Sequence, residues 1–177
     1  LVLAEAAADH LGLARVLFVP AGAPPHKEAS AVRAGADHRL AMTRLAIAGN
    51  ARFALARTDI DRPGPHYTVD MLRLLRDEYP HSDLVLLIGG DSLRDLPTWS
   101  RPQELIALAR LGVLRRPADD IDLAALERAI PCLLYTSDAA DDLLCVDLGG
   151  RRIIQTKNAK DYHYIAKHLQ PTHNTHH

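Results

Sequence analysis

Apolar and polar positions alternate along this chain with two different periods, which together predict its secondary structure. Apolar residues at helical spacing predict five helices, at Leu1–Gly12, His38–Ala48, Thr68–Glu78, Pro102–Ala109 and Asp122–Ile130. Short apolar or β-branched runs predict four strands, at Arg15–Ala21, Phe53–Ile60, Leu84–Ile88 and Leu111–Arg115. Because strands alternate with helices, the pattern favours a right-handed, parallel α/β sheet with flanking helices.

Two residues mark predicted helix ends. Gly12 follows the first helical pattern in the C′ position, where glycine commonly closes a helix. Thr68 follows a turn rich in proline and glycine and is predicted to be the N-cap of the helix that runs to Glu78.

The segment Leu84–Trp99, LVLLIGGDSLRDLPTW, is the most informative block of the chain. It reads as a buried strand that ends at Gly89-Gly90, followed by Asp91 and, further on, by the single tryptophan of the sequence. Ligands of open α/β sheets bind at the carboxyl ends of strands, where glycine permits close approach to the backbone. An aspartate there can accept hydrogen bonds from sugar hydroxyls or help to hold a metal, and an indole can face an aromatic ring. The alternative is an ordinary strand–turn–helix corner.

Three further segments carry candidate binding groups. His26 and Lys27 follow a stiff Pro-Pro pair after the first strand, and Arg115-Arg116 end the last one. Such cations suit phosphate groups, although a solvated loop is the simpler interpretation of either segment alone. Near Tyr67 and Thr68, backbone N–H groups open a helix and favour an anion, which is equally consistent with a capped helix.

Composition limits the class of protein. The chain has 177 residues, 47% of them hydrophobic, and a net charge of −1, which fits one soluble cytoplasmic domain and gives no electrostatic case for nucleic acid. No apolar run approaches a membrane span, and no signal peptide is recognisable. Cys132 and Cys145 form neither a metal-type cluster nor a disulfide framework, and the histidines lack the fixed spacing of ligands, so no protein-held metal site is expected.

Taken in order, the blocks FVPAGAPPHK, TDIDRPGPHYTVDML, LLIGGDSLRDLPTWSRPQEL and LGVLRRP resemble bacterial nicotinate-nucleotide adenylyltransferase, a Rossmann-like nucleotidyltransferase. The resemblance runs from Leu1 to about Pro131. It implies transfer of AMP from ATP, with Mg²⁺, to nicotinate mononucleotide in NAD biosynthesis, which gives deamido-NAD and pyrophosphate. The small molecules ATP and nicotinate mononucleotide are thus the expected partners; the oligomeric state is left open.

The same resemblance assigns roles to individual residues. Gly89 and Asp91 would hold the nucleoside part of ATP, and Trp99 would stack on the pyridine ring. The backbone at Tyr67 and Thr68 would receive the nicotinate carboxylate. Phosphates would contact three basic residues, namely His26, Lys27 and Arg116.

Two family motifs are not found in the sequence. The GGTFDPxHxGH loop, whose histidines bind the ATP phosphates, would precede Leu1, and the ISxTxxR segment has no counterpart. We therefore expect a fragment without its first strand, with no catalytic residues retained and without activity of its own. The alternatives are another nucleotidyltransferase, such as pantetheine-phosphate adenylyltransferase, and a non-catalytic nucleotide-binding module.

Composition changes sharply after Pro131. Up to that residue the chain has fifteen arginines and one lysine, and beyond it two arginines and three lysines. Cys132–Asp141 reads as a translation of TGTCTCTTATACACATCTGACGCTGCCGAC, which resembles a transposase-type sequencing adapter, and Cys145–Ile154 resembles the next part of it. The expected organisation is a partial nucleotidyltransferase domain at 1–131 and a non-native, disordered tail at 132–177, against the alternative of a genuine C-terminal subdomain.

Overall fold

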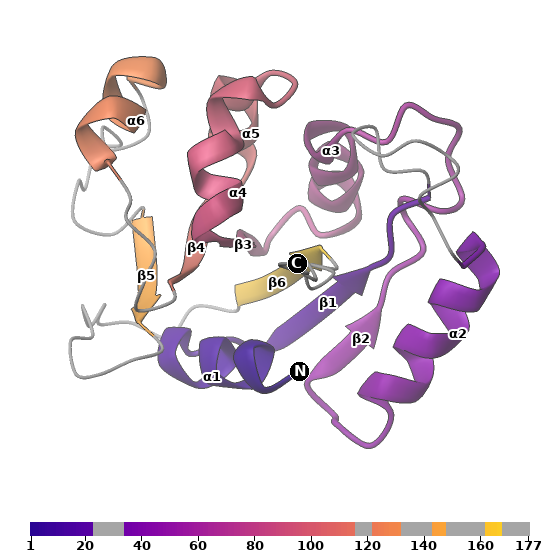
Figure 1. The fold of residues 1–177 in the computed structure, drawn as a ribbon. Helices are drawn as coiled ribbons and strands as arrows, with labels where there is room; N and C mark the ends of the chain where they lie inside the picture. The colour runs from indigo at the N-terminus through magenta and orange to yellow at the C-terminus, as the bar shows by residue number, and fades with distance from the viewer. Residues whose placement is uncertain (23–33, 116–121, 132–142, 148–161, 168–177) are drawn as a thin grey trace, which may run out of the picture.

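A six-stranded parallel sheet forms the centre of the computed structural model, which describes residues 1–22, 34–115, 122–131, 143–147 and 162–167 (Figure 1). The strands are β1 (Arg15–Val19), β2 (Phe53–Leu55), β3 (Asp83–Gly89), β4 (Arg110–Arg115), β5 (Leu143–Asp147) and β6 (Tyr162–Lys167). Their order across the sheet is β2-β1-β6-β3-β4-β5, and all of these neighbours pair in parallel. The predicted α/β class with a parallel sheet and flanking helices is confirmed.

Helices cover both faces of the sheet. They are α1 (Val2–Leu11), α2 (Ala36–Ile47), α3 (Thr68–Glu78), α4 (Gly90–Asp95), α5 (Pro102–Leu108) and α6 (Leu123–Ala129), with the 3-10 turn η2 (Leu96–Thr98) after α4. Alternate residues of β3 divide between two cores: Leu84, Leu86 and Ile88 pack with α3 and α5, whereas Val85 and Leu87 pack with the alanines of α1. This period of two explains how one continuous apolar strand serves both faces. No helix in the described part of the chain is long and apolar enough to cross a membrane.

Most predicted elements occur within a few residues of their expected bounds, and two details differ. Gly12 closes α1 at φ 63°, as predicted, but the prediction of Thr68 as N-cap is wrong. Tyr67 is the N-cap of α3, with extended backbone, and Thr68 is the first helical residue. Strand β2 ends at Leu55 instead of Ile60, because the chain then turns, with the N–H of Ile60 donating to the Arg57 carbonyl at 2.8 Å.

Strands β5 and β6 come from segment 132–177, which was expected to be disordered. In the structure β6 lies between β1 and β3 and pairs with both: Ile165, for example, lies opposite Leu17 on one side and Leu86 on the other. The two halves of the sheet, β2-β1 and β3-β4-β5, are therefore joined by a strand from far along the chain (Figure 1). The non-native origin of the segment stays a prediction.

Candidate functional site

The carboxyl ends of β3 and β4 lie side by side. Gly89, the last residue of β3, is in register with Leu114 near the end of β4. The chain leaves β3 directly into α4, for which Gly89 is the N-cap, and Asp91 is exposed in its first turn. One carboxylate oxygen of Asp91 accepts the N–H of Ser92 at 2.9 Å. Gly89 and Asp91, the two residues predicted to hold the nucleoside of ATP, thus lie at the carboxyl edge of the sheet, the edge at which ligands of open α/β sheets bind.

Topology brings the start of α3 and the Trp99 turn to the same edge. Helix α3 ends at Glu78, shortly before β3 begins, and α5 ends at Leu108, just before β4 begins. Both helices run back along the sheet, so their N-termini lie toward the carboxyl ends of the strands. Thr68 is buried and Tyr67 half-buried at the first of these N-termini. Trp99, half-buried against the larger core, lies just before the second.

Arg39 of α2 fixes the backbone that follows β1. Its guanidinium donates to the carbonyl oxygens of Ala21 at 2.5 Å, Gly22 at 2.7 Å and Ala34 at 2.5 Å. These carbonyls flank the segment that carries His26 and Lys27, which lie outside the described residues together with Arg116. The placement of those three predicted phosphate ligands therefore stays a prediction, whereas the backbone on either side of the first two is held by one side chain.

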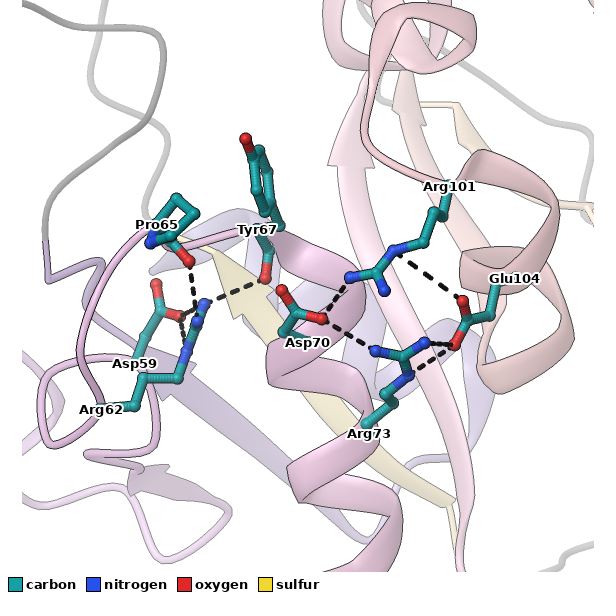
Figure 2. Close-up of polar contacts among 8 residues, drawn as sticks. All are labelled: Asp59, Arg62, Pro65, Tyr67, Asp70, Arg73, Arg101 and Glu104. Carbon is teal, nitrogen blue, oxygen red and sulfur yellow. Dashed lines mark hydrogen bonds and ion pairs between the residues drawn. The ribbon is translucent and has the colours of Figure 1, made fainter.

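A buried ion pair organises the loop that leads into α3 (Figure 2). The carboxylate of Asp59, with an exposed fraction of 0%, accepts from Arg62 Nη2 at 2.5 Å and Nε at 3.0 Å. Arg62 also donates to the carbonyl oxygens of Pro65 and Tyr67, each at 3.0 Å. One guanidinium thus joins the start of this loop to the N-cap of α3, and the direction in which α3 begins depends on it.

His66 packs this loop against the end of β1. Its ring is buried, and its Nδ1 lies 3.8 Å from Asp59 Oδ1. The backbone of Gly22 lies directly against it: a Cβ at Gly22 would be 2.5 Å from His66 Cε1 and 2.7 Å from the Asp59 carbonyl oxygen. Only a residue without a side chain permits this approach, so the segment after β1 and the segment before α3 are packed together.

We expect the Gly22→Ala variant to be destabilised by about 1–3 kcal/mol, the usual cost of forcing extra atoms into a packed site. The new methyl meets a backbone carbonyl, which cannot swing aside as the end of a flexible side chain can. Urea unfolding measures the loss. Gly35→Ala is the matched control, because a Cβ at Gly35 would meet no atom of the described residues within 4 Å. Equal stability of the two variants would contradict the close packing.

Four charged side chains connect α3 with α5 (Figure 2). Asp70 Oδ1 accepts from Arg73 Nη1 at 3.0 Å and also pairs with Arg101 Nη2. Glu104 Oε1 accepts from Arg73 at 2.5 Å, and its Oε2 lies 3.9 Å from Arg101 Nε. We call these four residues the α3–α5 charge cluster. It ties the first turns of two helices whose N-termini lie at the candidate site.

Sequence reasoning missed both charge networks. The spacing of Asp59 and Arg62 is a local signal, since these residues are three apart, but it does not reveal that the pair is buried. The α3–α5 charge cluster joins positions 31 residues apart, as in the Arg73–Glu104 contact, and a single sequence carries no mark of such pairing.

In the described residues, no group of three or more histidine, cysteine, aspartate or glutamate side chains is placed to hold a metal ion.

Comparison with known proteins identifies the family. The model of the cytidylyltransferase-like family matches residues 1–167. A probable nicotinate-nucleotide adenylyltransferase from Synechococcus sp. (strain JA-3-3Ab) is 39% identical over 178 residues, covering 95% of this chain and 85% of that protein. The chain belongs to the nicotinate-nucleotide adenylyltransferase family. A relative of the same name from Thermomicrobium roseum is 50% identical over 131 residues, which are 74% of this chain and 61% of that protein.

This chain therefore spans about three fifths of the length of some of the curated family members that it matches. Among solved structures, nicotinic acid mononucleotide adenylyltransferase of Plasmodium falciparum complexed with NaAD matches with a TM-score of 0.57. The match has 14% sequence identity and covers 78% of this chain and 62% of that chain. At such identity the likeness shows a shared fold, which agrees with the Rossmann-like nucleotidyltransferase fold expected from the sequence.

Proposed function

We propose that this chain carries the substrate-binding part of an enzyme that transfers AMP from ATP to nicotinate mononucleotide. The products are deamido-NAD and pyrophosphate. The observation that carries the proposal is the convergence of Tyr67, Thr68, Gly89, Asp91 and Trp99 at one edge of the sheet, in a chain of the nicotinate-nucleotide adenylyltransferase family. A small-molecule site is the simplest use of such an edge.

The proposed mononucleotide site lies between α3 and the Trp99 turn. The start of an eleven-residue helix favours an anion, so the backbone at Tyr67 and Thr68 would receive the nicotinate carboxylate. The half-buried Trp99 would stack on the pyridine ring. Arg116 would hold the phosphate of the mononucleotide.

ATP would bind toward the end of β3. Gly89 allows the nucleoside to approach the backbone, and the exposed Asp91 carboxylate would accept hydrogen bonds from the ribose hydroxyls. His26 and Lys27 would contact phosphates. We propose that a divalent cation, Mg²⁺, arrives bound to the phosphates of ATP as part of that substrate, because Mg²⁺ in nucleotide sites is commonly held by the substrate's own phosphates.

The reaction is an in-line displacement. A phosphate oxygen of nicotinate mononucleotide attacks the α-phosphorus of ATP, a new P–O bond forms, and the bond to the pyrophosphate oxygen breaks as pyrophosphate leaves. The residues named above contribute by holding the two reactants in line and by balancing charge. Because the HxGH and ISxTxxR motifs are not in this sequence, we also propose that the chain binds substrates but turns them over poorly.

A substrate titration tests the proposal. Trp99 is the single tryptophan of the chain, so its fluorescence reports this site alone, and we expect nicotinate mononucleotide to quench it more strongly than nicotinamide mononucleotide. By calorimetry, Trp99→Ala should weaken mononucleotide binding by about 0.5–1.5 kcal/mol, the value of an aromatic stacking pair. ATP affinity should not change. Equal binding of both mononucleotides, or of neither, would contradict the assignment.

A further inference from the structure

Arg101 has a backbone conformation that is unusual for its residue type. At φ 52° and ψ 58° it is the one non-glycine residue with a positive φ among those that the structure describes, and it is the N-cap of α5. Glycine or asparagine adopts this left-handed region at much lower cost than arginine does. An arginine at this position therefore indicates that its side chain is needed.

The side chain of Arg101 joins the α3–α5 charge cluster. It pairs with Asp70 and lies near Glu104. The four side chains of the cluster are between 29% and 44% exposed, and ion pairs at that exposure contribute little to the stability of the fold. The backbone strain at Arg101 is therefore not explained by a gain in stability from its ion pairs. We infer that these ion pairs instead fix the positions of neighbouring groups.

The neighbouring groups are those of the proposed mononucleotide site. Arg101 lies two residues after Trp99. The backbone N–H of Trp99 donates to the Leu96 carbonyl oxygen at 3.0 Å. Asp70 lies two residues after Thr68 in the first turn of α3. Figure 2 shows the Asp70–Arg101 pair between the first turn of α3 and the residue that precedes α5. By sequence position, this pair connects the turn that carries Trp99 with the backbone proposed to receive the nicotinate carboxylate.

We propose that Asp70 and Arg101 are positioning residues, which hold the Trp99 ring at a fixed distance from the N-terminus of α3. The Trp99 ring and the N-terminus of α3, between which we propose that the nicotinate ring and its carboxylate bind, then have their bound separation before the ligand arrives. This inference rests on the proposed function of the site. Neither residue needs to touch the substrate, because the pair acts through the Trp99 turn.

Arg101→Gly separates positioning from stability. Glycine favours the left-handed backbone, so the melting temperature should stay the same or rise, while the link to Asp70 is lost. Affinity for nicotinate mononucleotide should fall by about 2- to 13-fold, the cost of ordering one side chain on binding. In the chain without ligand, time-resolved anisotropy of Trp99 should show a larger fast component. Asp70→Asn should likewise lower the affinity for nicotinate mononucleotide and enlarge the fast component of the Trp99 anisotropy. Neither variant should change the affinity for ATP.

Arg52→Ala is the matched control. Arg52 makes similar ion pairs with Glu5 and Asp9 of α1, on the other face of the sheet from α3 and α5. It should change neither the mononucleotide affinity nor the Trp99 anisotropy. If the unaltered chain shows no response to nicotinate mononucleotide, the proposed function and this inference fail together. If the unaltered chain binds nicotinate mononucleotide, but Arg101→Gly and Asp70→Asn bind it with the same affinity and show the same Trp99 anisotropy, the positioning role alone is refuted.

Discussion

Replacing Arg62 with alanine is expected to destabilise the fold by about 3–5 kcal/mol, the usual cost of removing one partner of a buried ion pair. The Asp59 carboxylate is fully buried, and its Oδ2 has no hydrogen-bond partner among the residues that the structure describes. Without Arg62, the titratable group that remains near Oδ1 among the described residues is His66, whose Nδ1 lies 3.8 Å away. The carbonyl oxygens of Pro65 and Tyr67 would also lose the hydrogen bonds from Arg62, although that of Tyr67 keeps the backbone N–H of Met71 at 3.3 Å.

Chemical denaturation of Arg62→Ala measures this loss, and a second substitution separates its causes. Asp59→Asn in the Arg62→Ala background removes the buried charge and should restore part of the stability, because an amide is cheaper to bury than a carboxylate. A double-mutant cycle then gives the coupling of the pair. Loss of equal size in the single and double variants would show that the missing hydrogen bonds, and not the unpaired charge, dominate.

The neighbouring pair of Arg57 with Asp61 supplies a matched control. It has the same residue types, with contacts at 2.7 and 3.0 Å, but both side chains are exposed. The hydrogen bond from Arg57 lowers the pKa of Asp61, yet water screens such a pair. Arg57→Ala should therefore leave the unfolding midpoint unchanged. A large loss there would contradict the argument that burial makes the Asp59–Arg62 pair important.

Local periodicity was enough to predict five of the six α-helices and four of the six strands that the structure describes, and with them the edge of the sheet at which we propose that ligands bind. Alternation of strands with helices implies parallel order, and parallel order brings Gly89 and the starts of α3 and α5 to one edge. These inferences need only residues near one another in the sequence. The N-cap of α3 was misplaced by one residue, because Tyr67 adopts the extended backbone without a side-chain cap.

Features that depend on distant residues were not predictable in this way. The charge of Asp70 is paired by Arg101, 31 residues away, and the left-handed backbone of Arg101 has no glycine or asparagine to signal it. The central place of β6 was also missed. A segment with the composition of 132–177 gives no local sign that six of its residues pair between two buried strands.

Removing residues 148–177 is expected to abolish cooperative folding, because it deletes β6. Five residues of β6 pair with β1 and five with β3. At about 0.5–1.5 kcal/mol for each net backbone hydrogen bond, the two ladders contribute about as much as the whole stability of a typical domain, about 5–15 kcal/mol. The larger core would also open, since it contains Leu17 of β1 and Leu86 of β3.

Near-ultraviolet circular dichroism and thermal unfolding of residues 1–147 would measure this effect. A shorter truncation that removes only 168–177 retains every described strand and should unfold like the complete chain. If residues 1–147 unfold as cooperatively as the complete chain, β6 is not required, and segment 148–177 behaves as part of the appended, non-native tail expected from its sequence. Loss of the transition in 1–147 alone would instead show that segment 148–177 completes the sheet, because its strand β6 joins β1 to β3.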